Sequence, residues 1–305
     1  MARKTDSKAT SVRANNDELA MFGPHVVALI DFLGQASALA RWDFVPSGAA
    51  EVSQWSLAVR QSMGRVALWR DEFRQQFEQY HSTKRDHENL FISRVPAETG
   101  DRFNDFRQTA LHHQYFSDTI IFYSPLQNEH GYWKVSNVAA FFVVCSLRFL
   151  TSLTEHTPLR GSIEVGMLSQ FETGDPYGPG LAKAHQLESE VADYPRIVVG
   201  PTLLSYLDWL ENNSGDDGAT KANRIISSKC RDLITQDSDG RWILDYLNDT
   251  FANACDKAAE WRKTQAKAFA FVQAELDSFR DKGDKKLTER YERLAAYFVS
   301  RGSGR

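Results

Sequence analysis

The sequence has few cysteines, and none of them has the spacing of a metal site or a disulfide framework. Cys145, Cys230 and Cys255 are the only three in 305 residues, and no two form a CxxC pair. A small, odd and scattered set of this kind excludes a disulfide scaffold and a thiolate metal site. It is typical of a protein from a reducing compartment, so we expect a cytoplasmic protein.

The chain also lacks long apolar runs. The longest extends from Val138 to Cys145 and is interrupted by Ser146 and Arg148, far short of the roughly 20 residues that a membrane helix needs. The stretch from Met1 to Asn16 is polar and mixed in charge, without the apolar segment of a signal peptide. These two absences predict a soluble protein without a membrane-bound part.

A surplus of charge of one sign is missing as well. The formal net charge is −4, from 36 basic and 40 acidic residues, so the basic bias of nucleic-acid-binding proteins is absent. Hydrophobic residues make up 42% of the chain, which is ample for a buried core. We expect a disordered tail over 1–20, one α/β domain over 21–250 and a helical extension over 251–305.

Hydrophobic periodicity predicts strands and helices along the whole domain. Strands are expected at 25–30, on both sides of Asp118 up to Pro125, and at 160–168, 197–199 and 242–247. In the strand at 160–168, residues 163, 165 and 167 are expected on one face and 162, 164 and 166 on the other. Helices are expected to start at Gly34 and to span 49–81, 135–154, 180–191, 201–235 around a loop at 213–218, 257–279 and 287–299.

Two aspartates stand at the ends of short apolar runs. Asp31 follows Val26-Val27-Ala28-Leu29-Ile30, and Asp118 precedes Thr119-Ile120-Ile121-Phe122. A carboxylate beside β-forming residues is costly unless something pairs with it. Two such carboxylates on neighbouring strands would form an oxygen site for Mg²⁺ or Mn²⁺, and a pair of such ions suits phosphoryl transfer.

Further motifs follow the two aspartates in a fixed order. They are Asp31-Phe32-Leu33-Gly34, Ser117-Asp118, Arg160-Gly161-Ser162-Ile163, the run from Gly178 to Glu188, and Tyr194-Pro195-Arg196-Ile197. In this order, over roughly residues 24–200, the chain resembles the class III nucleotidyl cyclase catalytic domain. Within that family it is most similar to the pyrimidine cyclases of bacterial antiphage (Pycsar) defence. The turn at Asp239-Gly240 and the helix at 289–298 also look like that group.

The resemblance implies a fold, an activity and partners. The fold would be α+β, with a ferredoxin-like central antiparallel sheet flanked by helices. The activity would be that of a uridylate cyclase, which converts UTP into 3′,5′-cyclic UMP and pyrophosphate with two Mn²⁺ or Mg²⁺ ions. Such enzymes act as homodimers with composite active sites, and their product activates a separate effector protein during phage infection.

The resemblance also assigns roles to residues. Asp31 and Asp118 would each bridge the two ions, and the backbone carbonyl of Phe32 would complete one coordination shell. Backbone amides from Gly34 through Gln35 to Ala36 would hold the β- and γ-phosphates, because a helix N-terminus offers unpaired N–H groups. The base-reading positions fall at Gln114 and Asp175, and a glutamine can serve either pyrimidine edge.

Two positions depart from the pattern of adenylyl and guanylyl cyclases. Their ribose-binding asparagine and transition-state arginine correspond to Ala182 and Gln186, so the positive charge would come from Arg160, Lys183 or Arg107. Four functions stay open. We expect a uridylate cyclase, since that type is the commoner in the resembling group. The alternatives are a cytidylate cyclase, a purine cyclase, and a degenerate cyclase fold that senses a nucleotide without turnover.

Overall fold

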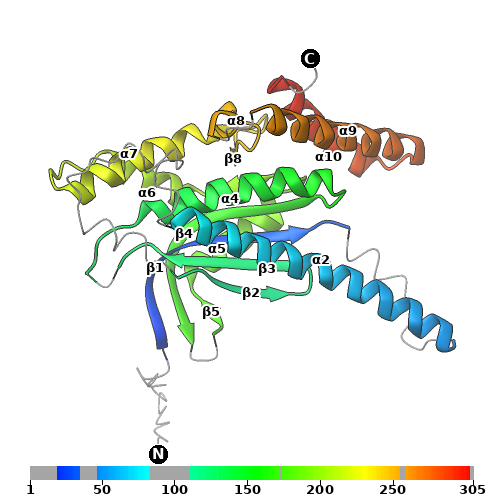
Figure 1. Ribbon diagram of the computed structural model, residues 1–305, viewed down its shortest axis with the longest axis horizontal. Coiled ribbons are helices and arrows are strands. Elements are labelled where there is room, and N and C mark those ends of the chain that lie inside the picture. The colour runs from blue at the N-terminus through cyan, green and yellow to red at the C-terminus, as the bar shows by residue number, and fades with distance from the viewer. Residues whose placement is uncertain are drawn as a thin grey trace, which may run out of the picture.

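The computed structural model describes residues 19–34, 47–82, 110–128, 130–171, 174–254 and 258–302. One mixed sheet runs through this part of the chain in the order β2-β3-β1-β4-β6-β8-β7, with β5 paired to β4 (Figure 1). All neighbours are antiparallel except β4 and β6. The strands are β1 Leu19–Phe32, β2 His112–Phe116, β3 Thr119–Pro125, β4 Leu159–Phe171, β5 Pro176–Tyr177, β6 Ile197–Val199, β7 Ile234–Gln236 and β8 Trp242–Leu244.

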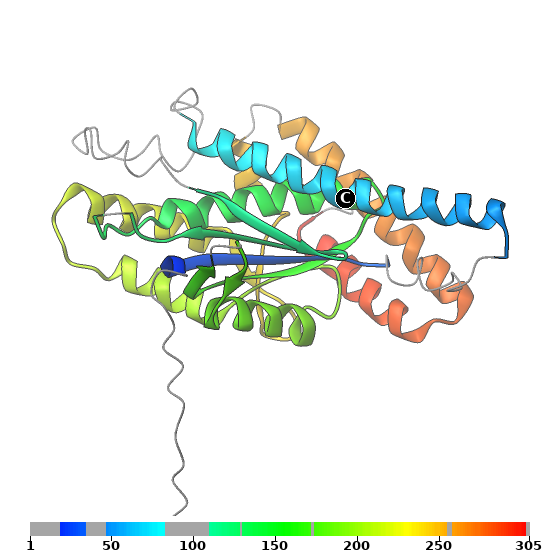
Figure 2. The same cartoon turned by 90° about the horizontal axis from the view of Figure 1, so that it is seen from below.

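Helices cover both faces of this sheet. They are α2 Ala49–His81, α4 Val135–Thr154, α5 Pro179–Gln186, the π-helical turn η4 Leu187–Val191, α6 Pro201–Glu211, α7 Gly218–Asp232, α8 Asp249–Ala254, α9 Ala258–Lys282 and α10 Lys285–Ser300. Helices α2 and α4 lie on one face and α5 lies on the other, as Figure 2 shows. Among the described residues, the sheet half therefore follows the succession β1-α2-β2-β3-α4-β4, with the strands in the spatial order β2-β3-β1-β4.

Alternation along β1 explains both layers. Val26, Ala28 and Ile30 point into the main core with α2 and α4. Val27 and Leu29 belong to a smaller cluster with Ala184 of α5 on the opposite face. Because side chains alternate along a strand, Asp31 falls on the α5 face, at the end of that row.

Helix α4 is buried on nearly every side. It is long and apolar enough to cross a membrane by composition, but 83% of its apolar window is buried inside the protein. The sheet packs on one side of it, and α7 and α9 pack on the other. Its all-round apolar pattern is thus that of a helix in the middle of a core, and the predicted bounds 135–154 are confirmed.

The C-terminal helices belong to the same core as the sheet. Leu294 and Phe298 of α10 are buried in the cluster that contains the central strands. Tyr297 donates a hydrogen bond of 2.6 Å to the buried Asp245, just after β8, and Arg301 forms an ion pair with the same carboxylate at 2.8 Å. The expected extension over 251–305 is therefore packed onto the domain. Of the disordered tail expected over 1–20, residues 1–18 lie outside the described residues, and residues 19 and 20 belong to β1 instead, because the pairing of β1 with β4 extends to Leu19.

Near β7 and β8, two predicted bounds are wrong, and each has a physical reason. Residues 234 and 235, expected to end a helix, belong to β7, because Ile234 pairs with Leu244 of β8. Strand β8 ends at Leu244 instead of residue 247, because residues 245–248 form a turn in which the Asn248 N–H donates to the Asp245 carbonyl at 3.0 Å. The alternation predicted along β4 holds, and the face with Ser162 and Glu164 packs against α5 and α6.

Candidate functional site

Three side chains from adjacent strands form a row at the end of the sheet. Asp31 of β1 lies opposite Thr119 of β3 and opposite Arg160 of β4 in the strand register. The Thr119 hydroxyl donates to Asp31 Oδ1 at 3.2 Å, and Arg160 Nε donates to Asp31 Oδ2 at 2.9 Å. Both oxygens of this half-buried carboxylate therefore have a partner.

Asp118 lies beside this row, in the two-residue turn between β2 and β3. Its backbone carbonyl accepts a hydrogen bond of 3.1 Å from the Phe32 N–H, which fastens the turn to the end of β1. Ser117 adopts a φ of 57° in the same turn, a conformation that favours small residues or glycine. Among the described residues, the Asp118 carboxylate has no hydrogen-bond or ion-pair partner. The structure thus brings the two predicted aspartates to neighbouring strand ends.

A third carboxylate, Glu188, reaches the row from the helical side. It stands in the π-helical turn after α5, where the Ala192 N–H donates to the carbonyl of Leu187, five residues earlier, at 2.9 Å. Single π-turns of this kind are frequent at functional sites. Glu188 Oε1 lies 2.8 Å from Arg160 Nε, and its side chain is only 5% exposed.

The carboxylate of Glu188 is incompletely satisfied. The single hydrogen on Arg160 Nε is directed at Asp31, so the buried Oε1 of Glu188 receives no hydrogen bond within the described residues. Burial raises the pKa of the Glu188 carboxyl above its ordinary value; Arg160 opposes this rise, while the charges of Asp31 and Asp118 add to it. Two acids, Asp31 and Glu188, therefore share one guanidinium, and a third, Asp118, lies near enough for its charge to act on Glu188.

Close backbone contact fixes the position of α5 and its π-turn. A Cβ atom on Gly166 of β4 would come within 2.7 Å of the Gly180 Cα, so the two glycines allow α5 to lie directly on the strand. The Ser162 hydroxyl also donates to the Ala184 carbonyl at 2.6 Å. These contacts place Glu188 above Arg160.

An apolar groove opens beside the three carboxylates of Asp31, Asp118 and Glu188, which we call the acidic row. It has a volume of about 560 Å³ and lies between α5 and the strands β1 and β3. Leu29, Ile121 and Leu181 line it together with Thr119 and Glu188, so the acidic row borders the groove. Its rim carries two exposed aromatic side chains, Phe116 at 82% and Tyr177 at 70% exposure.

The predicted base-reading residues also meet. Gln114 Nε2 donates to Asp175 Oδ1 at 2.5 Å, across 61 positions of sequence. Because an ionised carboxylate only accepts hydrogen bonds, the amide nitrogen must face Asp175, and the amide oxygen of Gln114 is left for another group. Nearby, burial and the charge of Asp175 raise the pKa of Tyr123 to about 12.

The remaining predicted residues lie as follows. Gly34 adopts a φ of 85° in the turn after β1, whereas Gln35, Ala36 and Arg107 lie outside the described residues. Lys183 points away from the acidic row, because its ammonium donates to the Thr202 hydroxyl at 3.0 Å. Of the two basic candidates that the structure describes, Arg160 is therefore the one that lies at the aspartates.

The donor set at this site fits a divalent cation that is bound together with a substrate. Within the described ranges, no three His, Cys, Asp or Glu side chains are grouped so that they could hold a metal by themselves. Asp31 and Asp118 offer two carboxylates, and Mg²⁺-type sites usually take their other ligands from water and substrate phosphates. The unpaired carboxylate of Asp118 and the orphaned oxygen of Glu188 leave negative charge for such a cation to balance.

Sequence reasoning missed Glu188 and Thr119 as site residues. Thr119 follows Asp118 directly, and its place opposite Asp31 depends on the register of β3 against β1. Glu188 ends the quoted run from Gly178, yet a glutamate near the end of a surface helix usually faces solvent. Its spacing from Gly180 would have placed Glu188 near the site, but only once the contact of α5 with β4 is known.

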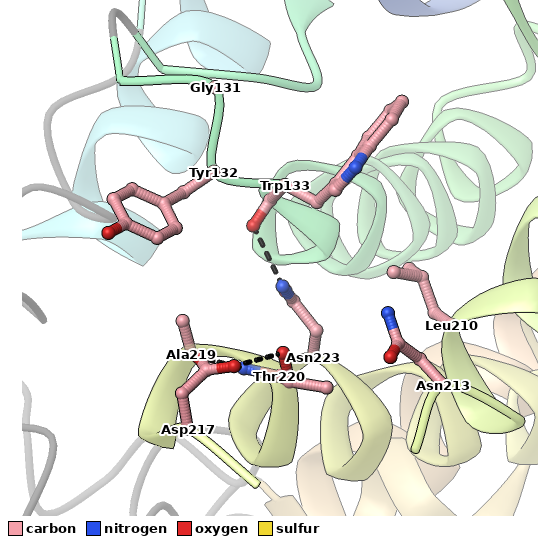
Figure 3. Close-up of a pocket in the computed structure, with 9 residues that line it drawn as sticks. All are labelled: Gly131, Tyr132, Trp133, Leu210, Asn213, Asp217, Ala219, Thr220 and Asn223. Atoms are coloured by element: carbon pink, nitrogen blue, oxygen red, sulfur yellow. Dashed lines mark hydrogen bonds between the residues drawn. The ribbon is translucent and has the colours of Figure 1, made fainter. Parts of the chain in front are cut away.

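A smaller pocket of about 180 Å³ lies at the other end of β3 (Figure 3). It is formed by the loop before α4 and by the N-terminal turn of α7. Its polar groups are already used: Asn223 Nδ2 donates to the Trp133 carbonyl at 2.9 Å, and Asp217 caps α7 by accepting from the Thr220 N–H at 3.0 Å. The hydrogen bond between Asn223 and Trp133 therefore joins α7 to the loop before α4, which indicates a structural role for this pocket.

Comparison with protein-family models, with curated proteins and with solved structures finds no match for this chain. Its function is therefore inferred from the residues and their geometry.

Proposed function

We propose that this protein is a pyrimidine nucleotide cyclase that converts UTP into 3′,5′-cyclic UMP and pyrophosphate. The observation that carries the proposal is the meeting of Asp31 and Asp118 at adjacent strand ends, beside a groove of nucleotide-compatible size. The succession β-α-β-β-α-β with strands ordered β2-β3-β1-β4 is that of a ferredoxin-like split βαβ unit. A class III cyclase domain is built on such a core, so fold and site support the same family.

The reaction requires few covalent steps from the protein. The 3′-hydroxyl of the substrate loses its proton to solvent, its oxygen bonds to the α-phosphorus, and the bond from that phosphorus to the pyrophosphate oxygen breaks. Asp31, Asp118 and the Phe32 carbonyl would hold two Mn²⁺ or Mg²⁺ ions, which activate the attacking oxygen and stabilise the leaving phosphates. Gly34 and Gln35 would contact the phosphates, and Arg160 would supply positive charge near Asp31.

The pairing of Gln114 with Asp175 supports a pyrimidine substrate. The carboxylate orients the glutamine so that its carbonyl oxygen is free to accept from uracil N3–H or from the cytosine amino group. The lysine that reads adenine and the glutamate that reads guanine are both absent at position 114. UTP is the substrate proposed here, and CTP is the alternative that the same geometry allows.

Assembly and signalling follow from the same proposal. The exposed Phe116 and Tyr177 at the groove rim are suited to a second protomer that would close composite active sites in a homodimer. Cyclic UMP would then activate a separate effector protein in antiphage defence. No nucleic acid and no membrane take part in this scheme.

One observation favours a second function, nucleotide sensing without turnover. Arg160 already occupies Asp31, and Ala182 lines the groove without any group that could orient a ribose. A protein of this kind would bind a nucleotide and form no product. A single measurement distinguishes the two functions.

That measurement is incubation of the purified full chain with ATP, GTP, CTP and UTP, each with Mn²⁺, followed by mass spectrometry. We expect cyclic UMP from the wild type and none from Asp118→Ala, while Asp216→Ala, at a fully exposed aspartate, matches the wild type. Cyclic CMP would change the base, and a cyclic purine product would refute pyrimidine selectivity. Nucleotide binding without any cyclic product would establish the sensing function instead.

A further inference from the structure

We infer that Glu188 is a positioning residue for Arg160, which it holds when a divalent cation replaces the guanidinium on Asp31. In this scheme Arg160 changes partner between two carboxylates, and Glu188 determines how easily it leaves the first. The inference rests on the proposed function, because it concerns the cation site at Asp31 and Asp118.

The first support is that two carboxylates compete for one N–H group. Arg160 Nε lies 2.9 Å from Asp31 Oδ2 and 2.8 Å from Glu188 Oε1, but it carries one hydrogen, which it donates to Asp31. Within the described residues, the two terminal nitrogens of Arg160 form no hydrogen bond. The guanidinium therefore has unused donors with which to bind Glu188 once it leaves Asp31.

The second support is the unsatisfied state of Glu188. Its side chain is 5% exposed, and its Oε1 is buried without a hydrogen-bond donor among the described residues. A buried acceptor without a donor carries a desolvation cost that native proteins rarely leave uncompensated. A shift of Arg160 towards Glu188 supplies the missing hydrogen bond at the moment when Asp31 needs its oxygens for a cation.

The third support is that the π-turn that carries Glu188 is held rigidly. Glu188 stands in the π-turn, whose last residue, Val191, accepts a hydrogen bond of 2.7 Å from Arg196 through its carbonyl. The preceding helix lies directly on β4 through Gly166 and Gly180. Glu188 is therefore a fixed anchor, and Arg160, at 23% exposure, is the partner that has room to move.

The test measures Mn²⁺ binding to the full chain in the presence of 2′,3′-dideoxy-UTP, which cannot cyclise, by electron paramagnetic resonance of the free ion and relative to the same nucleotide without protein, in four proteins. These are the wild type, Glu188→Gln, Arg160→Gln and the double variant. We expect Glu188→Gln to weaken Mn²⁺ binding roughly tenfold, because Arg160 then stays on Asp31. Arg160→Gln should tighten binding, since the competitor for Asp31 is gone.

The double variant distinguishes a role of Glu188 in positioning Arg160 from a direct attraction of the cation by the charge of Glu188. If Glu188 acts through Arg160, Glu188→Gln should change Mn²⁺ binding by less than about twofold once Arg160 is absent. An equal weakening in both backgrounds would mean that Glu188 attracts the cation through its charge alone, and it would overturn the inference. Glu190→Gln is the matched control, because Glu190 stands in the same turn and is exposed; it should leave Mn²⁺ binding unchanged.

Failure of the inference and failure of the proposed function give different results. Normal cyclic UMP synthesis together with unchanged Mn²⁺ binding in Glu188→Gln would overturn only the role of Glu188. Mn²⁺ binding with the expected pattern but no cyclic product would overturn only the cyclase. A wild type that binds no Mn²⁺ would overturn both. Glu188→Asp keeps the charge and should restore part of the binding, which a general packing defect would not allow.

Discussion

Two arginines of this protein each contact more than one carboxylate, and they differ in how many of those carboxylates receive a hydrogen bond. Arg196 is 2% exposed and binds Asp237 at 2.5 Å and Asp239 at 2.7 Å. It also donates to the Val191 carbonyl and lies over the ring of Tyr194 at 4.6 Å. Arg160 is 23% exposed and directs a single N–H at one of its two acids.

The difference separates a structural cluster from a binding site. Around Arg196, both terminal nitrogens are used and each acid has a donor, although Arg196 Nε has no acceptor among the described residues. We call this cluster saturated; it joins η4 and β6 to the turn between β7 and β8. Around Arg160, the terminal nitrogens are unused and the buried Oε1 of Glu188 has no donor among the described residues, so we call this cluster unsaturated. Folded proteins usually satisfy buried polar groups, so the unsatisfied oxygen of Glu188 beside two further acids needs an explanation, which a bound cation would supply.

The two clusters are also connected. Arg196 binds the carbonyl of Val191, the last residue of the π-turn that carries Glu188. The saturated cluster around Arg196 therefore fixes the π-turn that carries Glu188. Rigid support for the residues that bind a ligand is the arrangement expected of a preorganised site.

The largest expected effect is a loss of activity when Asp118, beside the unsaturated cluster around Arg160, is replaced. Asp118→Ala should reduce cyclic UMP formation by at least about 10³-fold, because bound metal ions contribute several kcal/mol to the transition state. The free energy of unfolding should change by less than about 0.5 kcal/mol, since the Asp118 carboxylate has no partner among the described residues. Steady-state rates and urea titrations of the same preparation check both numbers.

The next effect is on stability at the saturated cluster. Arg196→Met should lower the free energy of unfolding by about 3–5 kcal/mol, because it leaves the carboxylate of Asp237, whose side chain is 8% exposed, without its partner and removes the ion pair with the more exposed Asp239. Arg160→Met should cost about 1 kcal/mol or less, since Arg160 has solvent access and few hydrogen bonds. Equal losses in the two variants, measured by urea unfolding, would remove the distinction between the clusters.

A smaller effect should have opposite signs at the two clusters. Asp118→Asn removes a carboxylate that faces other acids, so it should stabilise the metal-free protein by about 0.5 kcal/mol. Asp239→Asn removes the partner of Arg196 and should destabilise it. Thermal unfolding in buffer with a chelator provides the comparison, and a loss of stability in Asp118→Asn would contradict the excess of acid described here.

The smallest effect is a difference in pH dependence. Burial raises the pKa of Glu188 above its ordinary value of 4.5, so its contribution to stability is fully present below that pH and is lost as the pH rises through the folded value. Burial of Asp239 opposes its ionisation, but hydrogen bonds from Arg196 and from the Arg241 N–H outweigh burial and lower the pKa below 3.8. The contribution of Asp239 is therefore present above pH 3.8 and is lost as the pH falls.

Free energies of unfolding between pH 3 and 7 test these signs. Relative to the wild type, Glu188→Gln should gain stability as the pH rises above 4.5. Asp239→Asn should lose least at the acid end of the range, where the wild type loses its own ion pair. A pH-independent difference for both variants would show that the two carboxyls titrate alike in the folded and unfolded protein.

The parts of this site that the sequence could predict are those that local patterns determine. The bounds of α2 and α4 follow from long helical periodicity, and Asp31 and Asp118 stand at the ends of short β-branched runs. The resemblance assigned Gln114 and Asp175 to the base-reading positions, and the structure brings these side chains together. The metal and nucleotide roles of all these residues stay predictions.

The parts that could not be predicted depend on packing between distant elements. Glu188 reaches Arg160 only because α5 lies on β4 through two glycines and then continues as a π-turn. Glu164 is fully buried because it accepts backbone N–H groups at the start of α6, a partner that strand alternation cannot reveal. In both cases the environment of a charged side chain is created by an element far away in sequence.

The most direct test of the cyclase site is anomalous diffraction at the manganese edge from crystals grown with Mn²⁺ and 2′,3′-dideoxy-UTP, which cannot cyclise. We predict manganese peaks at Asp31 and Asp118, with uracil beside Gln114 and with Arg160 turned from Asp31 to Glu188. Absence of manganese at the two aspartates, with the ion pair between Arg160 and Asp31 intact, would contradict the account.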